Sequence, residues 1–279
     1  MIYTAGIDVG STYSKAVIMS EANQLVGRGL VKTGFKLAEA GERALLQAEA
    51  QAGLERENLA YIASTGYGRF QIHFRNVNVT DLTAAAHGAR FWFPNTRTIL
   101  DVGGQTMKAS RLDDGGKVKS FRLNDKCAAG TGAFLEKTAR YMGFSTEEIG
   151  PLAATSKQVV PISGVCAVFA ESEVINHLSQ GSSPADIMHG AIASLVDRSV
   201  QLMRRVQMEP EFTLVGGILR FETMARVVRD KLGVAVNVPE GDLVQYVAAL
   251  GAALLARRRL QKLGEQGTPI TLASAAVPA

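Results

Sequence analysis

The sequence predicts an α/β protein made of two similar halves, with a ligand cleft between them. Three observations support this: a segment near residue 8 is repeated near residue 101, strand patterns alternate with helical patterns, and the chain has 279 residues. A chain of this length fits one large domain or two of medium size. With 47% hydrophobic and 20% charged residues, the composition is that of a globular protein with a substantial core.

The repeat relates segment 8–16, DVGSTYSKA, to segment 101–109, DVGGQTMKA. Asp, Val, Gly, Lys and Ala coincide, and polar turns at 20–24 and 113–117 follow at the same offset. Each copy reads as strand, glycine turn, strand, polar turn and strand. Two unrelated hairpins would explain the Asp-Val-Gly match alone, but not the aligned Lys-Ala pair and the second turn. We therefore interpret the chain as a duplication, and ligands are often bound between such halves.

The elements are expected in alternating order. In the first half, strands are predicted over residues 3–7, 15–19 and 25–31, and helices over 37–52 and 80–91. In the second half, strands over 98–100, 107–112 and 118–123 precede helices over 132–142 and 187–206, a strand over 212–215 and a helix over 243–260. The expected division is a first half 1–93 completed by helix 244–262, a second half 94–243 that carries the cysteines, and a flexible tail 263–279.

The two repeated glycine turns have the features of a polyphosphate site. Gly10 and the pair Gly103-Gly104 allow backbone N–H groups to approach a ligand without obstruction by a Cβ atom. Ser11 and Thr12 add hydroxyl donors, and Lys15 adds positive charge one strand further on. Such turns can hold phosphate groups in a nest of backbone N–H groups.

Asp8 and Asp101 occupy matched positions at strand ends, one in each half. Two carboxylates facing a phosphate chain would repel it unless a cation lies between them, and Mg²⁺ suits this role because it uses few protein carboxylates. Each aspartate could instead cap its own turn, but the matched pair favours a functional role. A further pair, Gly216-Gly217, follows a strand and could admit a base or ribose. Neither a Walker A sequence nor G-x-G-x-x-G occurs at these turns.

Composition argues against several other classes of protein. A net charge of +4 gives no reason to expect binding to nucleic acid or membrane. The sequence contains no apolar run of about 18 residues, so no transmembrane helix is expected. The N-terminal residues read as a strand and not as a signal peptide. Two cysteines without an export signal indicate a reducing compartment, so a cytoplasmic location is expected.

The two cysteines, Cys127 and Cys166, each lie among small residues just before an expected helix. Backbone N–H groups at a helix N-terminus stabilise thiolates, and thiolates are suitable ligands for iron–sulfur clusters or zinc. A [4Fe–4S] cluster usually takes four thiolates, so a chain that supplies two would share the cluster with a second chain. Spacing alone leaves open that each cysteine is a small buried apolar side chain, because no C-x-x-C is present.

Four segments resemble, in their order along the chain, the nucleotide-binding motifs of the acetate kinase, sugar kinase, Hsp70 and actin superfamily. GIDVGST at 6–12, DVGGQT at 101–106, VGG at 215–217 and ALGAALLA at 249–256 are similar to its phosphate-1, phosphate-2, adenosine and second connecting motifs. The resemblance covers nearly all of the chain up to Arg258. It implies two duplicated ribonuclease-H-like halves that close on Mg-ATP.

The cysteine segments resemble a narrower family. NDKCAAGTGAFLE at 124–136 and VCAVFAESEV at 165–174 are similar to the two cysteine motifs of 2-hydroxyacyl-CoA dehydratase activators and benzoyl-CoA reductase ATPase subunits. This resemblance implies that Cys127 and Cys166 ligate one [4Fe–4S] cluster, shared with an identical or homologous ATPase subunit of a dimer. It also implies partner subunits that reduce a CoA ester, and reduced ferredoxin or flavodoxin as the electron donor.

The activity implied by the resemblance is ATP hydrolysis coupled to one-electron transfer. Asp8 and Asp101 would hold Mg²⁺ through water, and Gln105 would position the attacking water. The expected nucleotide-binding residues are Gly10, Ser11, Thr12, Lys15, Gly103 and Gly104 at the phosphates, with Gly216 and Gly217 near the adenosine.

One position departs from the pattern of the activators, which commonly carry Asp where this chain has Thr106. This difference favours an electron-activating subunit of the benzoyl-CoA reductase type, whose partner reduces an aromatic acyl-CoA, over a homodimeric activator of a 2-hydroxyacyl-CoA dehydratase. A small-molecule kinase of the same superfamily is a further alternative, against which Gln105 and the cysteine motifs argue. The last alternative is a non-enzymatic, nucleotide-dependent scaffold.

Overall fold

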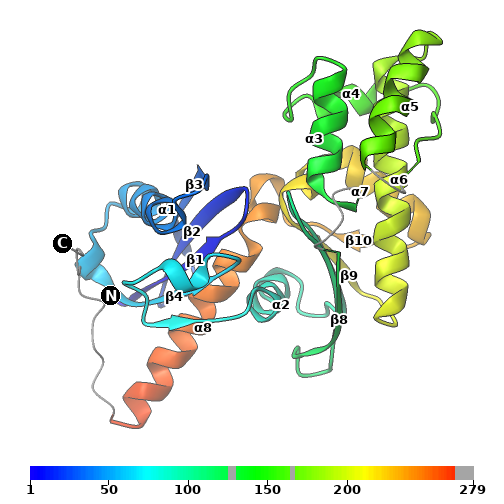
Figure 1. The fold of residues 1–279 in the computed structure, drawn as a ribbon. Coiled ribbons are helices and arrows are strands. Elements are labelled where there is room, and N and C mark those ends of the chain that lie inside the picture. Colours follow the sequence, from blue (N-terminus) through cyan, green and yellow to red (C-terminus); the bar gives the residue numbers. More distant parts are fainter. Residues whose placement is uncertain (125–129, 164–166, 268–279) are drawn as a thin grey trace. The chain divides into compact units, whose positions relative to one another are not determined.

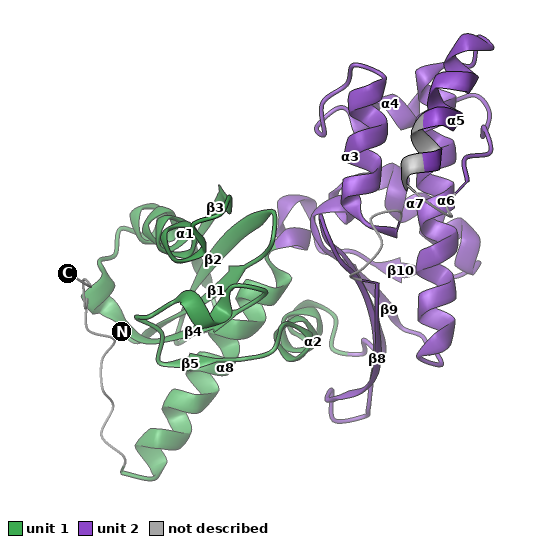
Figure 2. Ribbon diagram, in the orientation of Figure 1, with its two compact units in different colours: residues 1–94, 246–279 green, residues 95–245 purple. Residues whose placement is uncertain are grey.

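The computed structural model describes residues 1–124, 130–163 and 167–267, and it confirms the predicted α/β class (Figure 1). The described residues form two five-stranded sheets. The chain divides into two compact units, here named unit 1 (residues 1–94 and 246–279) and unit 2 (residues 95–245) (Figure 2). Each unit contains one of the two sheets.

Unit 1 is built on a sheet with the strand order β3-β2-β1-β4-β5. Strands β1 to β3 form an antiparallel meander, whereas β1 pairs with β4, and β4 with β5, in parallel. Its helices and strands are β1 (Tyr3–Val9), β2 (Tyr13–Ser20), β3 (Leu25–Lys32), α1 (Leu37–Ala52), β4 (Leu59–Thr65), β5 (Val77–Asn78), α2 (Asp81–Trp92) and α8 (Val247–Glu265), with short 3-10 turns at Arg56–Asn58 and Arg69–Gln71.

Unit 2 repeats this topology with the strand order β8-β7-β6-β9-β10. Its helices and strands are β6 (Thr98–Val102), β7 (Met107–Leu112), β8 (Val118–Asn124), α3 (Gly132–Tyr141), α4 (Ile149–Ala154), α5 (Ala167–Ser179), α6 (Pro184–Arg205), β9 (Phe212–Val215), α7 (Glu222–Leu232) and β10 (Val236–Asn237), with 3-10 turns at Gly217–Arg220 and Gly241–Gln245. Strand order and strand direction therefore agree between the units, which confirms the predicted duplication.

Helices cover both faces of the sheet in unit 1, and the side chains of β1 alternate between them. Ile7 packs with Leu45 and other α1 residues in one apolar cluster. Gly6 points to the opposite face, where a Cβ atom added to it would lie 2.0 Å from the carbonyl oxygen of Ala249 in α8. The alanine-rich sequence of α8 is therefore explained by a helix that lies very close to the sheet.

Local sequence signals define α6, the longest helix of unit 2. The Ser183 hydroxyl accepts a hydrogen bond from the backbone N–H of Asp186 at 3.2 Å, and Pro184 occupies the first turn. The apolar face buries Leu195 in the same cluster as Met107 of the sheet. Sequence periodicity predicted a helix over 187–206, and the observed helix begins three residues earlier because of this N-terminal cap.

No element was predicted for residues 59–65, where the structure has β4. This strand is buried along nearly its whole length, so it lacks the polar alternation that identifies a half-exposed strand. Helix α7 was likewise not predicted. Within the part of the chain that the structure describes, no helix is both long and apolar enough to cross a membrane.

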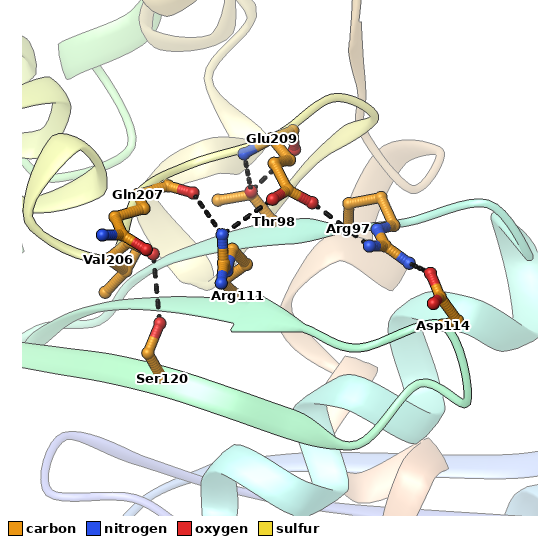
Figure 3. A network of polar contacts seen from close by, with 8 residues as sticks. All are labelled: Arg97, Thr98, Arg111, Asp114, Ser120, Val206, Gln207 and Glu209. Carbon is orange, nitrogen blue, oxygen red and sulfur yellow. Dashed lines mark hydrogen bonds and ion pairs between the residues drawn. The ribbon is translucent and has the colours of Figure 1, made fainter.

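A polar network stabilises the end of the unit 2 sheet at which β6 begins (Figure 3). Arg111 on β7 donates to the Glu209 carboxylate at 2.7 Å, and Arg97 contacts the other carboxylate oxygen at 3.1 Å. The Thr98 hydroxyl donates to the backbone carbonyl of Glu209 at 2.7 Å. These contacts attach the segment before β9 to β6 and β7, at the opposite end of β6 from Asp101.

Candidate functional site

In unit 1, a row of polar side chains crosses the sheet at the carboxyl end of β1. Asp8 pairs with Lys15 on the antiparallel strand β2 and with Thr65 on the parallel strand β4. Because residues in register share a face of the sheet, all three side chains lie on the face that α8 covers further along β1. The Lys15 ammonium group donates to Asp8 Oδ2 at 3.2 Å. Asp8 and Thr65 are buried, at 8% and 0% exposure.

Gly66, which follows β4, lies directly beside the Asp8 carboxylate. Its φ of +86° is in the left-handed region, and an added Cβ atom would lie 2.3 Å from Asp8 Oδ1 and 2.6 Å from the carbonyl oxygen of Val9. Contacts this short exclude any side chain unless the backbone moves. The position therefore requires glycine for both its conformation and its space.

The turn between β1 and β2 is held by Thr33, which follows β3. The Gly10 N–H donates to the Tyr13 carbonyl at 3.2 Å, and the Thr33 hydroxyl donates to the Gly10 carbonyl at 2.8 Å. The Thr33 N–H donates to the Thr12 carbonyl at 3.0 Å. Ser11 is exposed, whereas the hydroxyl oxygen of Thr12 is buried and has no hydrogen-bond partner among the described residues. A fixed turn with spare hydroxyl donors suits phosphate binding.

Unit 2 repeats this arrangement around Asp101. Asp101 pairs in register with Lys108, and their charged groups are 3.6 Å apart. The Gly103 N–H donates to the Thr106 carbonyl at 2.8 Å. Gly216 follows the parallel strand β9 with a φ of +102°, and an added Cβ atom would lie 2.7 Å from Asp101 Oδ1. Each unit therefore combines an aspartate, a lysine and a glycine of positive φ in equivalent places.

Two hydrogen bonds attach the unit 2 turn to α3. The N–H groups of Gly132 and Ala133, in the first turn of the helix, donate to the carbonyls of Gly103 and Gly104 at 2.9 and 2.8 Å. An added Cβ atom on Gly132 would lie 2.7 Å from the Ile218 side chain, so the helix end fits tightly. Helix α3 follows the segment that carries Cys127. A displacement of the turn would therefore be transmitted directly to this helix.

The structure places the sequence-predicted site residues in two groups, one in each unit. Unit 1 contains Asp8, Gly10, Ser11, Thr12 and Lys15, and unit 2 contains Asp101, Gly103, Gly104, Gln105, Gly216 and Gly217. Gln105 is exposed, and Gly217 begins the 3-10 turn after β9. Cys127 and Cys166 lie outside the described residues.

Thr33, Thr65 and Gly66 were not among the site residues predicted from the sequence. Thr65-Gly66 at the end of β4 corresponds to Val215-Gly216 at the end of β9. In each pair the first residue is the last of the parallel strand next to the aspartate-bearing strand, and a glycine follows it. The sequence did contain a signal: segment 59–65, LAYIAST, is followed by a glycine, as is segment 212–215, FTLV.

The donor set fits a magnesium–phosphate group better than a metal held by protein alone. Among residues 1–124, 130–163 and 167–267, no group of three or more His, Cys, Asp or Glu side chains is placed to bind a metal ion. Magnesium commonly binds through one or two carboxylates together with water and substrate phosphates. Each unit has a single aspartate beside a glycine turn, and the unit 1 turn adds the hydroxyls of Ser11 and Thr12, which is consistent with that mode.

The topology and the repeated aspartate turns together define a duplicated ATPase fold of the actin and ribonuclease-H-like class. The model of the BadF/BadG/BcrA/BcrD ATPase family matches residues 5–256, and the chain belongs to this family.

Relatives and solved structures of this family are similar over almost the whole chain. The activator of lactoyl-CoA dehydratase from Anaerotignum propionicum is 41% identical over 261 residues, which cover 94% of this chain and 100% of the relative. A benzoyl-CoA reductase subunit from Thauera aromatica is 32% identical, with 96% and 97% covered. The activator of 2-hydroxyisocaproyl-CoA dehydratase from Clostridium difficile, solved with bound ADPNP, superposes with a TM-score of 0.90 at 35% identity, covering 96% of this chain and 99% of that one.

Proposed function

We propose that this protein is an ATP-hydrolysing activator that passes electrons to a partner enzyme of the 2-hydroxyacyl-CoA dehydratase type. The observation that carries the proposal is the repeated site, in which an ion-paired aspartate lies beside a glycine turn in each unit. Membership of an ATPase family supports nucleotide hydrolysis at these turns. The names of two relatives, at 41% and 37% identity, support the class of partner.

The chemistry assigned to the chain is phosphoryl transfer to water. Asp8 in unit 1 and Asp101 in unit 2 would each be able to hold water molecules of a magnesium ion, and Gln105, which is exposed, would orient the attacking water. Lys15 pairs with Asp8 at 3.2 Å and would add positive charge beside a bound phosphate. The phosphates bind to the backbone and hydroxyls of Gly10, Ser11, Thr12, Gly103 and Gly104, and Gly216 and Gly217 pass close to the adenosine.

The coupling element in this proposal is the junction between the unit 2 turn and α3. Loss of the terminal phosphate changes the ligands of the turn, and the hydrogen bonds from Gly132 and Ala133 pass that change to the helix. We assign Cys127 and Cys166 as ligands of a [4Fe–4S] cluster shared by two chains, on their sequence motifs alone. When bound, such a cluster supplies one-electron chemistry, with reduced ferredoxin or flavodoxin as the donor.

The comparisons favour one of the two alternatives left by the sequence. Thr106 pointed towards a benzoyl-CoA reductase subunit, but the dehydratase activators are 36–41% identical and the reductase subunit is 32% identical. We therefore place the homodimeric activator first and the reductase subunit second. A direct test compares Mg-ATP-dependent activation of a 2-hydroxyacyl-CoA dehydratase with that of a benzoyl-CoA reductase lacking its ATPase subunits. If the protein activates the reductase and not the dehydratase, the reductase subunit becomes the preferred alternative.

Nucleotide hydrolysis is tested by Asp8→Asn, which removes the charge but keeps the shape of the side chain. We expect ATP turnover to fall about 100-fold or more, because a group that holds the metal ion contributes several kcal/mol to transition-state stabilisation. The control is Asp197→Asn, which removes a half-exposed carboxylate from an ion pair with Lys231 elsewhere in unit 2. Equal turnover in the Asp8 variant and the control would remove Asp8 from the site.

The cluster assignment is tested separately by Cys127→Ala and Cys166→Ala, purified without oxygen. Each variant is expected to lose iron and acid-labile sulfide while it still binds Mg-ATP. A full and stable cluster in either variant would exclude that cysteine as a ligand.

A further inference from the structure

We infer that Thr65 is a positioning residue of the nucleotide site, whose hydroxyl binds an oxygen atom of the hydrated magnesium–phosphate group beside Asp8. The inference rests on the proposed function and adds a residue that lies 57 positions from Asp8 in the sequence. Thr65, Asp8 and Lys15 all lie within unit 1.

The position of Thr65 follows from strand pairing. It is the last residue of β4, and it lies in register with Asp8 on β1, which is itself in register with Lys15 on β2. The three side chains therefore form a row, with Asp8 in the centre and Lys15 on its far side from Thr65. The Lys15 ammonium group satisfies Asp8 Oδ2, and Gly66 lies against Oδ1.

The Thr65 hydroxyl is buried and unpaired within the described residues. The side chain is 0% exposed, and its oxygen has no hydrogen-bond partner there. Buried hydroxyl groups in folded proteins are nearly always hydrogen-bonded, because an unmade bond leaves the cost of desolvation uncompensated. In unit 1 the Thr12 hydroxyl, on the adjacent phosphate turn, has the same property. Two unsatisfied hydroxyls at one end of the sheet indicate a shared polar ligand.

Unit 2 shows that the fold does not need a hydroxyl at this place. Val215 has the equivalent register with Asp101, it is buried, and Gly216 follows it as Gly66 follows Thr65. Valine has almost the same shape as threonine, so packing is satisfied by either residue. The hydroxyl of Thr65 is therefore left to interact with a ligand and not to support the strand.

The ligand has the chemistry of an oxygen atom on a hydrated magnesium–phosphate group. A threonine hydroxyl can donate to a phosphate oxygen, and it can also accept from a water molecule bound to the metal. A phosphate oxygen and a metal-bound water are both expected beside a carboxylate that holds magnesium through water. The two cases differ in their dependence on magnesium, which separates them by experiment.

The test compares Thr65→Val and Thr65→Ser with Thr4→Val. Thr4 lies on β1, on the same face of the sheet as Asp8 and Thr65. It is 1% exposed and its hydroxyl donates to the Ala253 carbonyl at 3.1 Å, so the hydroxyl has a partner within the fold. Melting temperature without nucleotide, calorimetric affinity for ADP and for the β,γ-imido analogue of ATP, and ATP turnover are measured for each variant.

Thr65→Val should melt at or above the wild-type temperature without nucleotide, because it removes an unsatisfied group. It should also lose roughly 10- to 100-fold in turnover or analogue affinity, as expected for a hydrogen bond to a charged group. Thr65→Ser should recover most of this loss. Thr4→Val should show the reverse pattern, with a lower melting temperature and wild-type turnover. Repeating the titrations with EDTA assigns the lost contact to a phosphate oxygen if the difference persists, and to metal-bound water if it disappears.

Two results would overturn the role of Thr65. The first is wild-type binding and turnover in Thr65→Val. The second is a melting temperature that falls as far as that of Thr4→Val, which would show that the hydroxyl supports the fold through an internal partner. Failure of the wild-type protein to bind or hydrolyse Mg-ATP would instead overturn the proposed function, and the Thr65 inference with it.

Discussion

Gly66→Ala is the substitution whose effect follows most directly from the geometry of unit 1. At a φ of +86°, an L-residue costs about 1–2 kcal/mol relative to glycine. The new Cβ atom would also lie 2.6 Å from the carbonyl oxygen of Val9, a backbone atom that cannot rotate away. Overpacking of this kind adds about 1–3 kcal/mol. The free energy of unfolding of unit 1 should therefore fall by about 2–5 kcal/mol.

The same substitution should affect chemistry, because the Cβ atom would lie 2.3 Å from Asp8 Oδ1 and would displace that carboxylate. The matched control is Gly53→Ala, at a φ of +65° with nothing within 4 Å, which tests backbone conformation alone. Urea unfolding and steady-state ATP hydrolysis are measured for both variants. If Gly66→Ala is no less stable than Gly53→Ala and hydrolyses ATP at the wild-type rate, Gly66 does not support the Asp8 carboxylate.

Two further predictions concern packing and acid stability. Gly6→Ala places a Cβ atom 2.0 Å from the Ala249 carbonyl, so α8 must move off the sheet, and thermal unfolding should show a loss of about 3 kcal/mol; an unchanged melting temperature would contradict this packing. Hydrogen bonds from the Gln158 N–H, the Ser183 hydroxyl and their neighbours hold the pKa of Asp186 well below its ordinary value of 3.8. A carboxylate whose pKa is lowered by folding stabilises the folded state above the ordinary pKa, and that contribution is lost as pH falls below it. Asp186→Asn should therefore lower the urea midpoint at pH 7 and reduce the fall of that midpoint as the pH is lowered. A midpoint that falls with pH in parallel with that of the wild type would show that the Asp186 carboxylate does not stabilise the fold in this way.

The parts of the site that the sequence revealed belong to local hairpins. Asp8 and Lys15 are separated by one tight turn, so a short segment determines their pairing, and the same holds for Asp101 and Lys108. The duplicated motif was therefore visible as a linear match. Helix α1 was predicted with its observed bounds, and the feature that ends it is also local, because Gly53 follows it in the left-handed conformation.

Thr65 and Gly66, which complete the Asp8 site, could not be found in this way, because they reach Asp8 through parallel pairing of β1 and β4. Gly216 was predicted from the glycine pair after its strand, but its place beside Asp101 follows from parallel pairing of β6 and β9. Between the members of each pair lie 56 or more residues with a helix of their own. The two intervals differ in length, so the offset that revealed the first repeat does not reveal this one.

The sequence by itself determined that this protein has two related halves, each with an aspartate at the end of a strand, next to a glycine turn. Only the tertiary structure decided that a glycine of positive φ supports each aspartate, and that a buried threonine stands beside one aspartate while valine stands beside the other. The physical reason is that hairpin register is set by neighbouring residues. Parallel register, in contrast, is set by how a whole sheet packs against its helices.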